Sequence, residues 1–551
     1  MKFDVGDSEI INHKPKIENA VLNEVKDPQS TIAMSRVLSF ATLTAAGFIL
    51  GRVSGLLREI VVSARFGLSA ELDAYFLAYI VPAIMDNLVA GSTIVAAVMP
   101  TFARFLMVGQ RDEFWRVASV ITNLVLLVSG VLTILGMIFA APIIAWLAPS
   151  MAASTQAIAA ALLAIVMPTL FLSALLNMLM AALNALDRFV GPALVFLALN
   201  VGIIGTVLLL SPVIGIYSVA LGFLIGVIFQ LLVQIFELRA ERARYSFVLD
   251  LRHPAFREVG IAFLPIVLLA LVVQINLLVD KSMASALPMG SISALQYADT
   301  LLGTFYMLGT SLGIAIFPSL SRLAATNDFE NTARAVTTSI RLLIFILMPL
   351  TLLLMLFSVP MVGVILGRGR FDAHAIQMTA YALTLYAVGL IALGALYVLQ
   401  RAFFALSAGT VPLIVGAGAI IVHIALNLAL IPIFAHAGIA LSVALTALFS
   451  AFTLLILFAW RVPTFKVAPI FGFLAQCALL SAVIVGADWI LSELLHIQSK
   501  TLMDWLIALT LAGISGVVYF LIALALKMPE PQMLVRLLDK FTAQFARRGA
   551  R

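Results

Sequence analysis

Apolar segments long enough to cross a lipid bilayer recur along almost the whole chain. A spanning helix needs about 20 mostly apolar residues, and the sequence contains about 14 such segments. The 551-residue chain is 63% hydrophobic and 11% charged, with a mean hydropathy of +1.13. Soluble domains are about 25% charged, so no soluble fold of this length could cover so much apolar surface. The sequence therefore predicts an all-α polytopic membrane protein.

The expected spans follow one another with short connections. Their limits are 37–63, 72–103, 117–147, 155–184, 192–211, 214–237, 259–287, 291–320, 335–366, 375–406, 410–432, 437–460, 468–490 and 503–526. All five tryptophans fall near the ends of these spans, as in the aromatic belts of membrane proteins.

Charges in the connections predict the orientation. Polar residues 1–36 are interpreted as a disordered cytoplasmic tail, and residues 527–551 as a cytoplasmic amphipathic tail. Alternate connections are rich in arginine. Several on the opposite side carry no Lys or Arg: 148–155, 211–217, 287–292 and 431–435. The positive-inside rule then places both termini in the cytoplasm. For this reason the net charge of +6 reflects topology, and no nucleic-acid partner is expected.

The chain also repeats itself. "ALNALDRFVGP" (182–192) aligns without gaps on "AFFALSAGTVP" (402–412), and "SVAL" occurs at 218–221 and 442–445. An even number of spans separates the copies, so the repeat is parallel. We therefore expect two six-helix lobes, followed by two helices outside the repeat. The expected limits are 37–237 for the N-lobe, 259–460 for the C-lobe and 468–526 for the last two helices.

Arginines in the first span suggest an anionic substrate. Arg52 lies near the expected bilayer midplane and Arg58 follows on the same helix. Intramembrane charges normally face a partner or a water-filled cavity. Guanidinium groups bind phosphate through paired hydrogen bonds. The alternative is structural, with Arg58 paired to Glu59 or Asp73.

Other polar residues within spans have two interpretations each. Asp73 is either a functional acid or a helix-start residue, and Asp86 is either a partner for the arginines or a proton or cation site. His423 and Asn427 share one helix face, and the pair forms either interhelical hydrogen bonds or an ion site. The single cysteine, Cys477, excludes a disulfide framework and is expected to pack in the interior.

Several ordered motifs resemble the MurJ/MviN family of lipid II flippases. They include "GRVSGLLREIVVSARFGLSAELDAYFLAYIVP", "INLLVDKSMASALPMGSISALQYAD", "LGRGRFD" and "LQRAFFALSAGTVP". The resemblance implies 14 helices, two lobes that alternate between inward and outward states, and an undecaprenyl-pyrophosphate-linked sugar as cargo. It also implies that the last two helices form a groove for the lipid tail. Arg52, Arg58 and Asp73 match positions that the family needs for function.

The chain departs from the family pattern at two expected substrate contacts and at its ion site. Asp86 lies near a position where the family usually has arginine, and Thr300 replaces the arginine of the family's Y-A-D-R motif. Asp280 matches the acid of a family sodium site, whereas His423 and Asn427 stand where an N-x-x-x-D pair would be. No cofactor is expected, and Na⁺, H⁺ or the membrane potential are the candidate energy sources.

We therefore expect a flippase, not an enzyme, in a bacterial cytoplasmic membrane. It would move a polyprenyl-pyrophosphate-linked saccharide, lipid II first among them, to the outer leaflet, with Arg52, Arg58, Asp73, Asp86 and Thr300 as substrate-site residues. The first alternative is a flippase for another lipid-linked glycan of capsule or exopolysaccharide. The others are a cation-coupled drug exporter and a transport-dead scaffold. The expected partners are the lipid-linked oligosaccharide, the bilayer, and cell-wall or polysaccharide assembly proteins.

Overall fold

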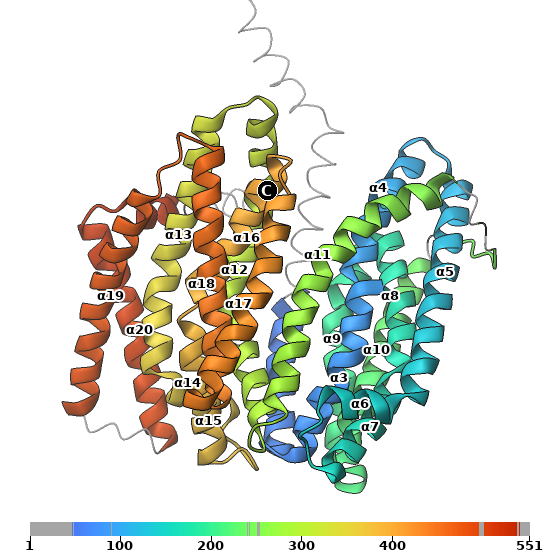
Figure 1. The fold of residues 1–551 in the computed structure, drawn as a ribbon, viewed down its shortest axis with the longest axis horizontal. Helices are drawn as coiled ribbons and strands as arrows, with labels where there is room; N and C mark the ends of the chain where they lie inside the picture. The colour runs from blue at the N-terminus through green and yellow to red at the C-terminus, as the bar shows by residue number, and fades with distance from the viewer. Residues whose placement is uncertain are drawn as a thin grey trace, which may run out of the picture.

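The computed structural model is helical throughout the residues it describes (Figure 1). Those residues are 47, 49–89, 91–239, 241, 243–248, 250, 254–494, 501–536 and 539, and within them there is no strand. The predicted N-terminal tail lies outside the described residues, as does much of the predicted C-terminal tail.

The helices follow the expected spans in order. A helix over residues 49–66 comes first. The others are α3 (Ala70–Val89), α4 (Ser92–Met107), α5 (Arg111–Ile138), α6 (Ala140–Leu147), α7 (Ala153–Val166), α8 (Pro168–Ala185), α9 (Val190–Ile214), α10 (Tyr217–Arg239), α11 (Pro254–Ala284), α12 (Ser291–Ala325), α13 (Phe329–Leu356), α14 (Ser358–Leu366), α15 (Ala373–Ala387), α16 (Leu390–Ala405), α17 (Thr410–Phe434), α18 (His436–Arg461), α19 (Ala468–Leu494) and α20 (Leu502–Ala525).

Length and composition alone identify 11 spans among the described residues, or 13 if each bent pair is one span. The bends lie within α11, at 41°, and between α15 and α16, at 47°. The expected first span, 37–63, is only partly described, and its described part is the charged helix 49–66. The polytopic membrane fold is thus confirmed, while the predicted count of 14 is not reached by this criterion.

Some expected spans are broken helices, which the sequence analysis did not anticipate. Expected spans 117–147 and 335–366 divide after Ile138 and Leu356. Pro142 and Pro360 each lie four residues beyond these ends. Because proline has no N–H to donate to the residue four positions back, a continuous helix would leave that carbonyl unpaired. Expected span 72–103 likewise divides into α3 and α4.

The predicted parallel repeat is visible in the backbone. Helices α5 and α13 have 28 residues each and begin 218 residues apart, and α9 and α17 have 25 each and begin 220 apart. Left-handed backbone conformations recur at the same spacing. The pairs are Gly109 and Asn327, Asp187 and Ser407, and Gly215 and Ala435. Equivalent helices and turns therefore occupy equivalent places in the two halves.

The halves form two neighbouring bundles (Figure 1). Helices α3 to α10 lie in one bundle and α12 to α18 in the other, with α19 and α20 at the far edge of the second. Helix α11 runs between the bundles and contacts both α4 and α17. Helix α19 packs on α13, and α20 packs on α14.

Candidate functional site

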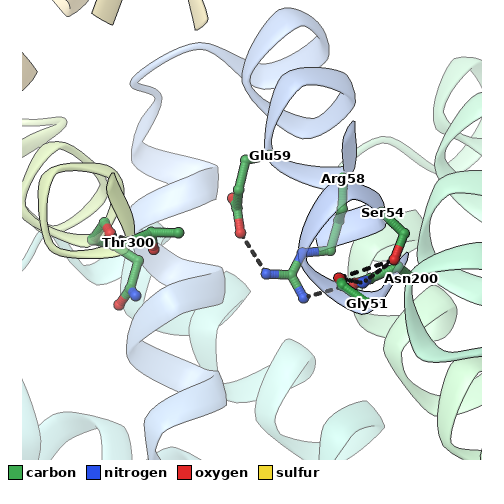
Figure 2. Close-up of polar contacts among 7 residues, drawn as sticks. Gly51, Ser54, Arg58, Glu59, Asn200 and Thr300 are labelled. Atoms are coloured by element: carbon green, nitrogen blue, oxygen red, sulfur yellow. Dashed lines mark hydrogen bonds and ion pairs between the residues drawn. The ribbon is translucent and has the colours of Figure 1, made fainter. Parts of the chain in front are cut away.

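Arg58 lies in a polar network on helix 49–66 (Figure 2). One guanidinium nitrogen pairs with Glu59, and another donates to Asn200 Oδ1 on α9 at 3.2 Å. The Asn200 amide nitrogen donates to the Gly51 carbonyl at 3.2 Å and to Ser54 Oγ at 2.9 Å. Because a buried charge is costly unless it is paired, Glu59 and Asn200 allow Arg58 to remain inside the membrane region. Of the two acids that the sequence offered as structural partners for Arg58, Glu59 forms the ion pair and Asp73 does not.

A cavity of about 140 Å³ opens beside Arg58. Its walls come from helix 49–66, α3, α9 and α10 in the first bundle and from α12 in the second. Gln296 and Thr300 are the α12 residues, and the Thr300 hydroxyl donates to the Gln296 carbonyl at 2.8 Å. At roughly 30 Å³ per water molecule, the cavity has room for only a few waters. It brings Arg58 and Thr300, which are 242 positions apart, into one site.

Arg52 lies on the same helix and is exposed. Its guanidinium has no hydrogen bond or ion pair among the described residues, and it is close enough to Tyr306 of α12 to interact electrostatically. An unpaired arginine at this depth is available to bind an anion.

Asp73, in the first turn of α3, joins the two bundles. Its carboxylate accepts hydrogen bonds from the backbone N–H of Gly290 at 2.6 Å and of Ser293 at 2.8 Å, and from Ser293 Oγ at 2.6 Å. These donors are at the start of α12, where free N–H groups and the helix dipole favour a negative charge. Asp73 therefore caps a helix of the other bundle, although it belongs to α3.

A second backbone contact closes the same end. The Arg370 N–H donates to the Ala64 carbonyl at 2.8 Å. Gly67 and Gly369 have φ of 60° and 59°, and a Cβ on either would collide with the opposing backbone. Glycine is thus required on both sides of this contact.

Asp86 faces another part of the first bundle. It is half-buried on α3 and accepts a hydrogen bond of 3.4 Å from Asn177 of α8. It lines neither the Arg58 cavity nor the larger cavity described below.

Half-buried Asp280 lies against buried His423 and Asn427, the three residues that the family resemblance grouped together. Asp280 Oδ1 is 2.7 Å from His423 Nε2 and accepts from the Asn427 amide at 3.0 Å. His423 Nδ1 lies 3.3 Å from Thr446 Oγ1 on α18. Asn427 Oδ1 is buried and has no donor among the described residues. The direct contact between Asp280 and His423 therefore joins α11 to α17, and the contact of His423 with Thr446 adds α18.

Asp280 and His423 line a cavity of about 360 Å³ that shares one lining residue with the Arg58 cavity. Gln296 lines both cavities. Buried Lys281 donates to Gln296 Oε1 at 2.9 Å, and its ammonium lies 5.8 Å from the ring centre of Phe76. Phe76 belongs to the Arg58 cavity. Lys281 is thus placed between the two cavities.

Within the described residues, no group of three His, Cys, Asp or Glu side chains could hold a metal ion. Cys477 is fully buried in α19. Its environment matches the packing role expected from the sequence.

Comparison with known proteins decides the family. The model of the family "Lipid II flippase MurJ" matches residues 62–510. The chain belongs to the MurJ family. This confirms the resemblance seen in the sequence and identifies a multi-pass membrane protein of a transporter family. The lipid II flippase MurJ of Burkholderia cenocepacia is 28% identical over 417 residues, covering 74% of this chain and 81% of that protein. A probable lipid II flippase MurJ from Vibrio cholerae is 28% identical over 503 residues, covering 87% and 94%.

Solved structures agree on the MurJ fold. A lipid II flippase MurJ in an inward closed conformation superposes with a TM-score of 0.75 at 24% identity, covering 88% of this chain and 99% of that one. An inward-facing multidrug transporter of the MATE family superposes with a TM-score of 0.61 at 18% identity, covering 76% and 95%. The better match is to MurJ.

The structure adds site residues that the sequence analysis did not select. Asn200, Gln296 and Thr446 are uncharged polar residues of membrane-spanning helices, and only the three-dimensional contacts separate them from ordinary packing residues. Lys281 carried a stronger signal, because a lysine inside a span is rare.

Proposed function

We propose that this MurJ chain is a flippase that moves lipid II across the membrane by alternating access. The observation that carries the proposal is the Arg58 cavity, whose walls come from both bundles. A pyrophosphate that binds Arg58 and Arg52 would contact residues that separate when the bundles rock. The lobes 37–237 and 259–460 are the proposed moving units, and Asp73 is the proposed contact between them at the closed end.

Cargo other than lipid II remains the second candidate, for one specific reason. Thr300 lies in the Arg58 cavity, where the family's pattern places a further arginine, and its hydroxyl is already bonded to Gln296. Asp86 brings no positive charge to the cavity either. A site with fewer guanidinium groups suits another polyprenyl-pyrophosphate-linked glycan of capsule or exopolysaccharide.

For energy coupling, we propose that the Asp280–His423 pair carries a proton. Asn427 belongs to the same site through its hydrogen bond to Asp280. Asp280 Oδ1 and His423 Nε2 lie 2.7 Å apart, and histidine is the side chain best suited to take up and release a proton near neutral pH. Lys281 lies next to Asp280 in the chain and donates a hydrogen bond to Gln296, which lines both cavities. A change in the charge of the Asp280–His423 pair would therefore alter the electrostatic environment of the Arg58 cavity through these two residues.

The proposed location is the bacterial cytoplasmic membrane with both termini in the cytoplasm. At one end of the first bundle, four arginines pair with acids: Arg111 and Arg116 near the start of α5, and Arg188 and Arg244 in segments between helices. The positive-inside rule makes that end cytoplasmic. Cell-wall assembly proteins are the proposed protein partners.

Reconstitution tests the transport proposal. Proteoliposomes with labelled lipid II should show headgroup transfer between leaflets, measured by the fraction of label accessible to an impermeant reagent. Transfer should depend on a pH gradient, and Asp280→Asn and His423→Gln should remove that dependence. No transfer of lipid II, together with transfer of another polyprenyl-pyrophosphate glycan, would favour the second candidate.

A further inference from the structure

A cavity of about 440 Å³, with charged and hydroxyl side chains among its lining residues, lies at the end of the molecule opposite Asp73, apart from the two cavities above. Its walls come from α13, the start of α19 and the segment after α20. Lys466 precedes the start of α19 by two residues, and Pro529 follows the end of α20 by four residues. Because membrane helices begin and end near the polar headgroups of the bilayer, this cavity lies at the headgroup layer.

Most charges in the cavity are already paired. Arg341 Nε donates to Glu530 Oε1 at 2.7 Å, and its guanidinium stacks 4.2 Å from the Phe473 ring centre. Arg334 pairs with Glu330 at 3.0 Å. Arg334 and Arg341 are thus both in ion pairs, and Lys466 is the third cation among the residues that line the cavity.

Two groups of opposite charge in the cavity still have unused hydrogen-bonding capacity. Exposed Lys466 has no hydrogen bond or ion pair among the described residues. Glu530 is only 6% exposed, and its second carboxylate oxygen, Oε2, is buried without a donor in the described part of the chain. A buried acceptor on a charged group is costly to leave unmade. A ligand that completes both groups must offer an anion and an N–H or O–H donor.

We propose that this cavity binds the phosphoethanolamine headgroup of a membrane phospholipid. The phosphodiester would lie against Lys466 and the hydroxyls of Thr337, Thr338 or Thr464, which also line the cavity. The primary ammonium would donate a charge-assisted hydrogen bond to Glu530 Oε2. A choline headgroup has the same charges but no N–H to donate, and a glycerol headgroup has donors but no positive charge. The site should therefore distinguish these three lipids.

A lipid fits the position of the cavity better than a soluble molecule. Met533, an apolar side chain that is 40% exposed, lies at the cavity beside Pro469 and Pro529. Such apolar surface next to a polar cavity suits the junction between a headgroup and its acyl chains. Headgroup recognition by charged pockets between membrane helices is a known mode of lipid binding.

Lipid retention by the purified full-length protein tests the proposal. The protein is mixed with equal amounts of phosphatidylethanolamine, phosphatidylcholine and phosphatidylglycerol of identical acyl chains, and bound lipids are counted by native mass spectrometry. We expect phosphatidylethanolamine to be retained about tenfold over phosphatidylcholine, the factor for one charge-assisted hydrogen bond. Glu530→Gln should remove that preference, and Lys466→Gln should weaken retention of all three lipids.

Matched variants separate recognition from general damage. Glu330→Gln changes an exposed acid of the same cavity and should leave the preference intact. Arg461→Gln removes an exposed cation that lines a different cavity and should leave retention intact. Equal retention of ethanolamine and choline lipids by the unmodified protein, or stronger retention of phosphatidylglycerol, would overturn the proposal whether or not Glu530→Gln folds. Binding of soluble glycerophosphoethanolamine as tightly as phosphatidylethanolamine would assign the cavity to a soluble ligand and also overturn the proposal. Because no transport is measured, this result is independent of the flippase proposal.

Discussion

Arg58 is held by one carboxylate next to it in the chain and one amide 142 residues away. The near partner, Glu59, could be anticipated from the sequence. The distant partner, Asn200, could not, because a single asparagine in an apolar helix has many equivalent interpretations. Together, Glu59 and Asn200 explain how the Arg58 guanidinium stays charged beside a small cavity when no cargo is bound.

The role of Arg58 in cargo binding can be separated from its role in the pair. In Arg58→Gln alone, Glu59 would remain buried without its partner, so a loss of transport could reflect instability. The double variant Arg58→Gln/Glu59→Gln keeps the site neutral. We expect it to fold and to lose lipid II transport by about 30-fold or more, because a charge-assisted phosphate contact contributes about 2–3 kcal/mol. Transport by the double variant at the normal rate would show that Arg58 serves only structure.

Asp73 shows what sequence reasoning misses at this scale. The sequence assigns it to the substrate site, yet the backbone N–H groups that its carboxylate accepts from are at the start of α12, 217 and 220 residues away, beside the Ser293 hydroxyl. Every non-proline residue has such a donor, so no sequence signal marks these two. Its proposed role at the substrate remains a prediction, alongside those of Arg52, Asp86 and Thr300.

Asp73→Asn should weaken the closed end. An amide offers one acceptor oxygen in place of two and no charge for the α12 N-terminus, a loss of about 1–2 kcal/mol. We expect a shift toward the state open at this end, measured as increased distance between spin labels at Leu68 and Met289. Ser293→Ala, which removes only one of the three hydrogen bonds, is the matched control and should shift less. An unchanged distance distribution in Asp73→Asn would contradict the proposed contact.

At the scale of helices, close backbone contacts set the packing of each bundle. A Cβ on Gly202 of α9 would lie 2.5 Å from the Cα of Gly226 on α10. Gly309 of α12 and Gly394 of α16 meet in the same way in the second bundle. Small residues at such crossings allow membrane helices to approach closely without a hydrophobic driving force.

Two glycines of α9 provide a matched test of this packing. Gly202→Ala should destabilise the protein by about 1–3 kcal/mol, because neither backbone can move away easily. Gly205→Ala, where a Cβ meets nothing within 4 Å, should be neutral or slightly stabilising. Thermal unfolding in detergent measures both, and equal melting temperatures for the two variants would contradict the assigned contact.

Glu241, just after α10, forms ion pairs with two other segments at the arginine-rich end. It pairs with Arg111 at the start of α5 and with Arg188 between α8 and α9. Burial raises the pKa of the Glu241 carboxyl, and hydrogen bonds from Arg188 and Arg111 lower it. The lowering is the larger effect, so the pKa of Glu241 is below its ordinary value. The stabilisation is therefore present above the pKa of the unfolded carboxyl, about 4.3, and is lost as the pH falls through the folded pKa.

Glu241→Gln should accordingly lower the melting temperature by about 2–4 °C at pH 7. The difference from the unmodified protein should shrink below about pH 4 as the native carboxyl takes up its proton. The control is Glu330→Gln, which breaks an exposed pair on one helix and should have little effect at either pH. A difference that stays constant down to pH 3 would mean that the ion pairs do not supply the stability.

Helices were easier to predict than their interruptions. Apolar length gave the order of the spans because bilayer thickness fixes that length. The breaks after Ile138 and Leu356 depend on single prolines that membrane helices often tolerate, so Pro142 and Pro360 could not be distinguished from kinks.

At the scale of the whole molecule, the repeat determines the architecture. Helices and left-handed turns recur 218 to 220 residues apart, which places two similar bundles side by side with α11 between them. Short sequence matches were sufficient to predict this arrangement. They could not predict how the bundles touch, because the contacts at Asp73 and Arg370 use backbone groups.

The central claim is that this molecule carries lipid II between leaflets through the Arg58 cavity. The most direct measurement is rescue of a bacterial strain depleted of its own lipid II flippase, with membrane levels of each variant confirmed by blot. We expect the unmodified chain to restore growth and the Arg58→Gln/Glu59→Gln variant, at equal level, to fail. Failure of the unmodified chain at normal membrane levels would contradict lipid II as the cargo, and rescue by the double variant would contradict the Arg58 cavity as its path.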